Sequence, residues 1–183
     1  MRRYIFTGAP GAGKTTLLAA LSGSGYRVVP EAATDVIAIQ QANGVVQPWT
    51  DAQFLSDILK LQKVRQTGER SAPVVLFDRS PVCTLALARY LSHPIPSDLS
   101  REVKRLVANR IYEPDVFLVR PLGFIEPTAA RRITYEDALA FEAVHESTYE
   151  QLGFNLVEVL PDPVPIRAAA VHAAIAALDT LRA

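Results

Sequence analysis

The stretch GAPGAGKTT, Gly8 to Thr16, constrains this chain more than any other part of its sequence. Its spacing, Gly-x-x-x-x-Gly-Lys-Thr, is typical of a P-loop, which wraps around the phosphates of a nucleoside triphosphate. The apolar run Tyr4–Thr7 before it predicts a buried strand, and the run Thr15–Leu21 after it predicts a helix. A glycine-rich turn that binds nothing is the alternative, but such a turn would not require this spacing between a strand and a helix. We therefore expect the chain to bind a nucleoside triphosphate.

The residues of this loop have separate expected roles. Gly8, Gly11 and Gly13 lack a Cβ, so the backbone can bend tightly and bring its N–H groups close to an anion. The N-terminus of the following helix adds partial positive charge. We expect Lys14 to reach the outer phosphates and Thr15 to offer its hydroxyl to Mg²⁺. The predicted nucleotide-binding residues are Gly8, Ala9, Pro10, Gly11, Ala12, Gly13, Lys14, Thr15 and Thr16.

Composition limits the remaining possibilities. The chain has 183 residues, 49% of them hydrophobic, and a formal net charge of zero. This length and balance predict one domain over residues 1–183, a monomer or homodimer, without a basic surface for nucleic acid. No apolar run is long enough to span a membrane, and the P-loop begins too early for a signal peptide, so we expect a cytoplasmic protein. Cys83 is the single cysteine, which excludes an internal disulfide and a cysteine-rich zinc site.

Strand-like and helix-like runs alternate along the whole chain. Strands are expected at residues 4–7, 27–29, 73–77, 116–119 and 155–160. Helices are expected at residues 15–21, 32–41, 53–64, 81–91, 99–110 and 134–153 and from 165 onward. A capping box at Thr50–Gln53 and a cap at Thr134 mark two of these helix starts. The alternation predicts an α/β fold of three layers, α/β/α, around a five-stranded parallel sheet.

In such sheets, ligands bind at the carboxyl ends of the strands, so the residues that follow each strand are the candidates for chemistry. Asp78 and Arg79 follow the third strand in the sequence FDRS. We expect Asp78 to join the Mg²⁺ shell, directly or through water, although it could instead cap the helix that begins at Pro81. Arg79 could clamp a phosphate or the acceptor hydroxyl, or form an ion pair with a neighbouring carboxylate.

Glu31 follows the second strand, in the sequence VPEAATD. A carboxylate at this position could accept a proton from an acceptor hydroxyl as that hydroxyl attacks the γ-phosphate. It could also do no more than favour the first turn of the helix that follows, where acidic residues are stabilising. Position alone leaves both interpretations open.

Arg131 and Arg132 end the long connection after the fourth strand. Phosphoryl transfer spreads negative charge over oxygens, and arginines on a mobile lid can stabilise it while the lid excludes water. The alternative is a pair of solvated arginines at a helix start, a position that is electrostatically unfavourable for cations. We therefore expect a lid at about residues 121–135 that carries at least one of the two.

Other residues give weaker signals. Gln53 and Phe54 begin a helix on the expected acceptor side, so Gln53 could hydrogen-bond an acceptor ring and Phe54 could stack on it, although Phe is more often core. His145 lies on one helix face with apolar residues, which favours a partly buried structural histidine. Cys83, one turn into a helix, is expected to be inert packing. The segment LPDPVP after the fifth strand is where an adenine could lie.

Together, the P-loop, VPEAATD, FDRS and the paired arginines before YEDALAFEAVHESTYEQLGF resemble the P-loop nucleoside-kinase-like group. The sequence DRS is similar to the Asp/Glu-Arg-Ser motif of deoxynucleoside kinases, and VPEAA resembles their Val-Pro-Glu segment, whose glutamate is the general base. Nearly the whole chain also resembles the AAA-domain family that includes the ribosylnicotinamide kinase domain.

This resemblance has specific implications for the fold and the site. It implies a strand order of 2-3-1-4-5, with Glu31 as general base and Asp78 near Mg²⁺. It also implies that Arg79 contacts the acceptor and that Arg131 or Arg132 belongs to a lid. With Gln53 and Phe54, which are candidates from their position at a helix start, Glu31 and Arg79 are the candidate residues for substrate binding.

The sequence predicts a small-molecule kinase that uses ATP, or GTP, with Mg²⁺ to phosphorylate a hydroxyl of a nucleoside or nucleoside-like acceptor. A nucleotide acceptor is the nearest variant, and an antibiotic-modifying phosphotransferase would use the same chemistry. The alternative from another class is a nucleotide-dependent switch, or an NTPase without a small-molecule acceptor. The Asn-Lys-x-Asp guanine-recognition motif is absent, which weakens the interpretation as a GTPase.

Overall fold

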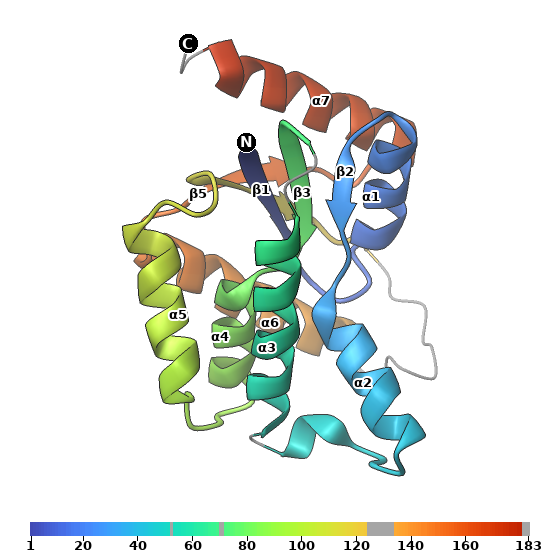
Figure 1. Cartoon of the computed structure of the whole chain (residues 1–183). Coiled ribbons are helices and arrows are strands. Elements are labelled where there is room, and N and C mark those ends of the chain that lie inside the picture. The colour runs from blue at the N-terminus through green and yellow to red at the C-terminus, as the bar shows by residue number, and fades with distance from the viewer. Residues whose placement is uncertain (52, 70–71, 124–133, 181–183) are drawn as a thin grey trace.

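A central parallel sheet organises the molecule in the computed structural model, which describes residues 1–51, 53–69, 72–123 and 134–180. Its five strands are ordered β2-β3-β1-β4-β5, and all the paired neighbours are parallel (Figure 1). The strands are β1 (Arg2–Thr7), β2 (Arg27–Val29), β3 (Val74–Asp78), β4 (Asp115–Val119) and β5 (Asn155–Val159). The predicted parallel sheet and its predicted strand order are both confirmed.

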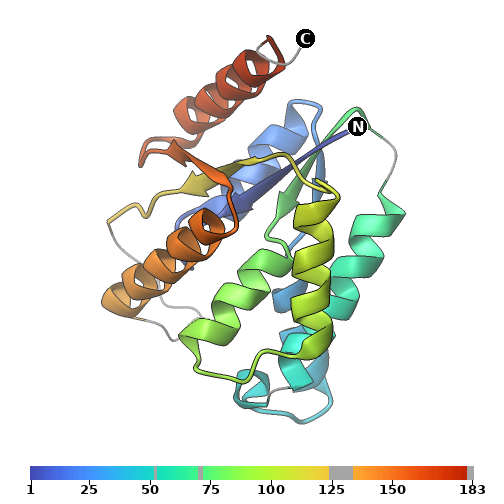
Figure 2. The same cartoon turned by 90° about the vertical axis from the view of Figure 1, so that its left-hand side faces the viewer.

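Helices cover the sheet on both faces, as the predicted three-layer arrangement requires (Figure 2). The helices are α1 (Lys14–Gly23), α2 (Ala32–Ala42), the short 3-10 helix η1 (Pro48–Thr50), α3 (Gln53–Gly68), α4 (Pro81–Tyr90), α5 (Ser97–Ala108), α6 (Tyr135–Gln151) and α7 (Val164–Thr180). None of the described helices is long and apolar enough to cross a lipid bilayer.

Successive side chains of β1 point to opposite faces of the sheet and pack in two separate parts of the core. Tyr4 and Phe6 are fully buried in a cluster with apolar residues of α1 and α7. Ile5 between them points to the opposite face and packs in a second cluster with residues of α3, α4, α5 and α6. A strand segment that is buried on both faces has to be apolar at each of its positions, which explains why Tyr4–Phe6 form a continuous hydrophobic run within β1.

The two predicted helix caps have different outcomes. Thr134 caps α6 as expected, because its Oγ1 accepts a hydrogen bond from the Asp137 N–H at 3.1 Å. The predicted role of Thr50 is wrong. Its hydroxyl donates to the Gln47 carbonyl within η1, and the Gln53 N–H at the start of α3 is accepted instead by Asp51 Oδ1 at 2.8 Å. The extra turn of η1 was not visible in the sequence pattern.

The carboxyl ends of all five strands lie at one edge of the sheet, because every pairing is parallel. The P-loop follows β1 at this edge, Glu31 follows β2, and Arg120 follows β4. Asp78 ends β3 and Arg79 comes directly after it. The sheet therefore brings residues that are far apart in sequence to one place.

Candidate functional site

The P-loop turns sharply between β1 and α1, and two of its glycines are required by its geometry. Gly8 has φ +128°, and a Cβ at this position would lie only 2.4 Å from the Val119 carbonyl oxygen of β4. Gly13 has φ +80° and forms the N-cap of α1. Both backbone conformations are rare for residues with side chains. The loop thus packs tightly on β4 and directs the N-terminus of α1 toward the same edge of the sheet, as an anion-binding loop requires.

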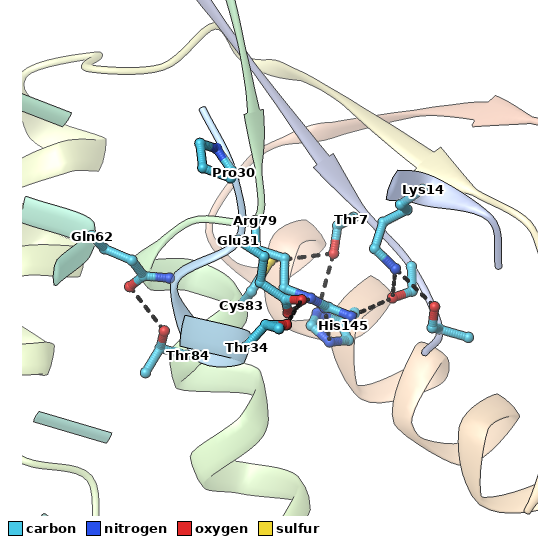
Figure 3. Close-up of polar contacts among 12 residues, drawn as sticks. Thr7, Lys14, Pro30, Glu31, Thr34, Gln62, Arg79, Cys83, Thr84 and His145 are labelled. Atoms are coloured by element: carbon cyan, nitrogen blue, oxygen red, sulfur yellow. Dashed lines mark hydrogen bonds and ion pairs between the residues drawn. The ribbon is translucent and has the colours of Figure 1, made fainter. Parts of the chain in front are cut away.

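Lys14 lies across the loop that precedes it. Its ammonium donates to the carbonyl oxygens of Ala9 at 2.8 Å and Gly8 at 3.1 Å, and its side chain is buried (Figure 3). Burial, followed by the positive charge of Arg79, lowers the Lys14 pKa from 10.5 to about 8. A buried cation that is destabilised in this way would gain strongly from a nearby phosphate.

A group of three side chains braces the loop from behind. Glu142 of α6 accepts a hydrogen bond from the Ala9 N–H through Oε2 at 3.1 Å, and its Oε1 accepts from Arg120 at 2.9 Å. Arg167 of α7 donates to the Ala12 carbonyl and to the Arg120 carbonyl, both at 2.9 Å. Glu142 and Arg167 are almost completely buried. These bonds hold the loop to β4, α6 and α7.

Glu31 and Arg79 form an ion pair beside the P-loop. Arg79 Nε lies 2.6 Å from Glu31 Oε1, and the Thr34 hydroxyl donates to Glu31 Oε2 at 2.8 Å. Burial alone would raise the Glu31 pKa, but the charges of Arg79 and Lys14 outweigh it and the pKa is lowered. Glu31 occupies the N-cap position of α2, yet its side chain makes no capping bond. Its carboxylate therefore contacts Arg79 and the Thr34 side chain rather than the backbone N–H groups of α2.

The backbone of Arg79 adopts a left-handed conformation, with φ +70°. This turn brings its Nη2 to 3.3 Å from the Gly8 carbonyl and its Nη1 to 3.2 Å from His145 Nε2. Burial alone would lower the Arg79 pKa, but the charge of Glu31 outweighs that effect and raises it. The guanidinium is therefore a fixed positive charge between the second strand end and the P-loop.

Asp78 is buried at the end of β3, and its Oδ1 has no hydrogen-bond partner within the described ranges. It does not cap α4, because Ser80 Oγ fills that role by accepting from the Val82 N–H at 3.2 Å. Burial raises the Asp78 pKa, the charge of Lys14 lowers it, and that of Glu31 raises it again, so that the net shift is upward. A buried carboxylate oxygen without a partner, close to a P-loop lysine, fits a cation site.

The donor set matches Mg²⁺ bound together with phosphates rather than a closed protein cage. Thr15 is exposed at the start of α1, where its hydroxyl is accessible. Among the described residues, no group of three or more His, Cys, Asp or Glu side chains could hold a metal ion alone. Mg²⁺ commonly uses one or two protein ligands, with phosphates and waters completing its octahedron. Asp78 and Thr15 are therefore the residues that would hold it.

The sequence placed His145 on a helix face as a partly buried structural residue, but the structure places it fully buried at the site. Its Nδ1 lies 3.2 Å from Thr7 Oγ1 at the end of β1, and its Nε2 meets Arg79. Cys83 is also buried, with its Sγ 3.4 Å from Thr7 Oγ1. Neither residue is isolated packing, since both belong to a polar network beneath the Glu31–Arg79 pair.

The remaining predicted residues lie elsewhere or outside the described ranges. Phe54 is buried in a small cluster between α2 and α3, and Gln53 donates to Asp57 Oδ1 at 3.1 Å on its own helix. Neither residue makes a described contact with the Glu31–Arg79 pair. Arg131 and Arg132, with most of the predicted lid at residues 121–135, lie outside the described ranges. The proposed roles of all four residues stay predictions.

Sequence reasoning missed the bracing residues Arg120, Glu142 and Arg167. Arg120 directly follows β4, so the rule for strand ends could have identified it. Its guanidinium contacts the carboxylates of Glu142, Glu146 and Glu158. Glu142 and His145 are three residues apart on α6 and therefore share a face, but the sequence does not say which face meets the strand ends. No sequence signal points to Arg167.

Comparisons with known proteins identify the family and the fold of the chain. A family model described as "AAA domain" matches residues 3–167 of the chain. No curated protein gives a significant sequence match.

The solved structures that resemble the chain share its fold at low sequence identity. Deoxyadenosine kinase from M. mycoides with bound dATP superposes with a TM-score of 0.62 at 14% identity, over 96% of this chain and 99% of that one. NadR in complex with NAD and AMP-PNP gives 0.65 at 17% identity, over 93% of this chain and 48% of that one. NadR in complex with NR gives 0.60 at 18% identity, and the chain spans half of its length.

Proposed function

Because the chain belongs to this AAA-domain family, we propose that it is a small-molecule kinase. It transfers the γ-phosphoryl group of ATP to a hydroxyl of a nucleoside or nucleoside-like acceptor. The observation that carries the proposal is the ion pair between Glu31 and Arg79, which lies beside a braced P-loop and its buried Lys14. A nucleotide-binding loop alone would not require a carboxylate and a guanidinium at this position.

The P-loop side of the site would bind and orient the triphosphate. The N–H groups at the start of α1 and the ammonium of Lys14 would bind phosphate oxygens. Asp78 and Thr15 would hold Mg²⁺, which supplies charge neutralisation to the β- and γ-phosphates when bound. Glu142 and Arg167 would keep the loop in this shape without contacting the nucleotide, since their bonds go to loop backbone atoms.

The Glu31–Arg79 side would bind the acceptor. The lowered pKa of Glu31 keeps its carboxylate ionised at neutral pH, so that it can accept a hydrogen bond and then the proton of an attacking hydroxyl. That proton becomes acidic only as the new phosphorus–oxygen bond forms, so a strong base is not required. Arg79 has five N–H groups and uses three of them in the described contacts, which leaves donors for an oxygen of the acceptor or of the transferred phosphoryl group.

The structural neighbours support the nucleotide-binding part of the proposal. Deoxyadenosine kinase was solved with dATP, and NadR was solved with AMP-PNP and with NR. Each of these proteins therefore binds a nucleotide. This chain shares their fold over most of its length. Their identities of 14–18% carry the fold but not the acceptor, so the acceptor has to be found by experiment.

The first test measures ADP release from Mg-ATP, and GDP release from Mg-GTP, with a panel of nucleosides, ribosylnicotinamide, nucleotides and aminoglycosides. Glu31→Gln removes the proposed base. Asp35→Asn is the matched control, because Asp35 is also a carboxylate of α2 paired with an arginine, Arg65. We expect one acceptor class to stimulate turnover in the wild type and in Asp35→Asn, but not in Glu31→Gln.

Two results would contradict the proposal. If no acceptor stimulates ADP release while ATP or GTP still binds in a Lys14-dependent way, the result favours a nucleotide-dependent switch or an NTPase without a small-molecule acceptor. If an acceptor is phosphorylated equally well by Glu31→Gln, Glu31 is not the base and the acceptor site lies elsewhere.

A further inference from the structure

The guanidinium of Arg79 is held by three groups from three different elements. Nε contacts Glu31 at the start of α2, Nη2 donates to the Gly8 carbonyl of the P-loop, and Nη1 meets His145 Nε2 of α6 at 3.2 Å (Figure 3). Glu31 and Gly8 already belong to the predicted site. His145 is the third support, and the proposed reaction does not use it.

The Arg79 contact fixes the protonation of the imidazole. Arginine is always protonated and only donates, so His145 Nε2 has to be an acceptor without a hydrogen. The ring is then neutral and carries its hydrogen on Nδ1, which donates to Thr7 Oγ1 at 3.2 Å. Burial, then the charges of Arg79 and Lys14, lower the His145 pKa well below its usual value, which agrees with a neutral ring.

A buried polar chain continues behind the imidazole and restricts its rotation. The Thr7 hydroxyl, which accepts from His145, contacts Cys83 Sγ at 3.4 Å. Cys83 Sγ lies 3.1 Å from the Tyr149 hydroxyl, and that hydroxyl lies 2.9 Å from Ser80 Oγ. These residues connect the ends of β1 and β3 with α4 and α6. On its other side the imidazole packs on the ring of Phe141, with ring centroids 4.4 Å apart.

We propose that His145 is a positioning residue that orients Arg79 toward the acceptor through a hydrogen bond from Nη1 to Nε2, with the imidazole held as the Nδ1–H tautomer by Thr7. The inference rests on the proposed kinase function, in which Arg79 contacts the acceptor. It makes α6, which also carries Glu142, a support for both halves of the site, because Glu142 bonds the P-loop and His145 bonds the arginine.

Two substitutions separate positioning from simple packing. In His145→Gln, the amide reaches the place of Nε2, and its carbonyl can accept from Arg79 while the bond to Thr7 is lost. In His145→Asn, the shorter amide lies near the place of Nδ1, so that it can bond Thr7 but does not reach Arg79. Both variants put a polar amide in the same buried volume, so a role in packing alone predicts similar behaviour for the two.

The kinetic readout is the acceptor KM and kcat at saturating ATP, with the Kd for ATP and the Tm of each variant. We expect kcat/KM for the acceptor to fall about 10- to 100-fold in His145→Asn, the usual effect of losing a hydrogen bond to a charged group. His145→Gln should stay within a few-fold of the wild type, and the ATP Kd should be similar in both. Equal losses in the two variants would overturn the proposal, even if both remain folded.

A second readout does not depend on catalysis. Nitrogen NMR of the wild-type imidazole should show a hydrogen on Nδ1 and none on Nε2, and the hydrogens on Arg79 Nη1 should exchange faster in His145→Asn than in His145→Gln. A hydrogen on Nε2, or equal exchange rates, would refute the positioning role whatever the activity. If the NMR results are as expected but no acceptor is phosphorylated, the proposed function fails and the positioning of Arg79 stands.

Discussion

The buried ammonium of Lys14 makes nucleotide binding dependent on pH in a range where the phosphates themselves have finished titrating. The Lys14 pKa is lowered to about 8, mainly by burial. A bound triphosphate would place negative charge beside the ammonium and raise that pKa again. Nucleotide should therefore bind the protonated form of Lys14, and its affinity should fall as pH rises through 8.

The expected change in the Kd for ATP follows from the fraction of Lys14 that is protonated in the nucleotide-free protein. With a pKa of about 8, this fraction is about three quarters at pH 7.5 and about one tenth at pH 9. If the bound form stays protonated over this range, Kd for ATP should rise about eightfold between the two pH values. The terminal phosphate loses its last proton near pH 6, so it contributes little to this change.

Lys14→Arg is the control, because arginine does not lose its proton in this range. We would measure Kd by isothermal titration calorimetry at several pH values from 7.5 to 9, in buffers of different ionisation enthalpy. The wild type should take up nearly one proton per nucleotide at pH 9, whereas Lys14→Arg should bind with a pH-independent Kd. A flat wild-type curve, or an equal slope in Lys14→Arg, would refute the assignment of the titration to Lys14.

The lowered pKa of Lys14 also predicts how the free energy of unfolding of the nucleotide-free protein depends on pH. Because the folded-state pKa lies below the unfolded value of 10.5, the unfolded chain binds more protons between about pH 8 and pH 10.5. The contribution of Lys14 to the free energy of unfolding should therefore increase with pH across this window, by at most about 3 kcal/mol. Urea unfolding at pH 8 and pH 10, compared with Lys14→Met, would show this difference as a slope absent from the variant.

Three further substitutions test the geometry of the site. Asp78→Asn should raise Tm, because it removes a buried carboxylate with an unpartnered oxygen. The same substitution should lower Mg²⁺-dependent turnover about 10- to 100-fold. A lower Tm measured by calorimetry would contradict the burial argument. Glu142→Ala should reduce the free energy of unfolding in urea by about 2 kcal/mol, because it leaves the buried Ala9 N–H without its partner and removes one of the three carboxylates that contact Arg120. Gly8→Ala should lower it by about 3 kcal/mol or more, since its Cβ would meet the Val119 carbonyl. Gly44→Ala, at a φ of +88° with no atom within 4 Å of its Cβ, should lower it by only about 1 kcal/mol; similar losses in the two would refute the steric reason.

The sequence predicted those features that depend on local order. The P-loop could be identified because its glycines, Lys14 and Thr15 act through fixed spacing between a strand and a helix. The parallel sheet followed from the alternation of elements, but its strand order came only from the family resemblance. Asp78 and Glu31 could be found because parallel strands bring their carboxyl ends to one edge. Local spacing and position at a strand end were sufficient to identify these residues from the sequence.

Other parts of the site depend on how the elements pack, which the sequence does not encode locally. His145 and Glu142 were visible only as members of one face of a helix, and their contacts depend on how α6 lies against β1 and the P-loop. Arg167 bonds residues about 150 and 50 positions away, so no sequence spacing could indicate it. For Phe54 the sequence left open both stacking on a ligand and packing in the core, and only the packing of α2 against α3 shows that it is buried between them.

Arg79 depends both on its place after a strand, which the sequence shows, and on contacts that only the packed fold provides. A non-glycine residue with φ +70° is conformationally unfavourable by about 1–2 kcal/mol, so the fold has to stabilise it elsewhere. The contacts with Glu31, His145 and the Gly8 carbonyl provide this stabilisation, and each comes from a different element. If the conformation served only folding, a glycine at position 79 would remove the unfavourable backbone term without needing these contacts. An arginine at this unfavourable backbone position, donating to the Gly8 carbonyl of the P-loop, is what the proposed contact with the acceptor would require. Because three contacts hold its guanidinium, its orientation should be sensitive to substitution of Glu31 or His145.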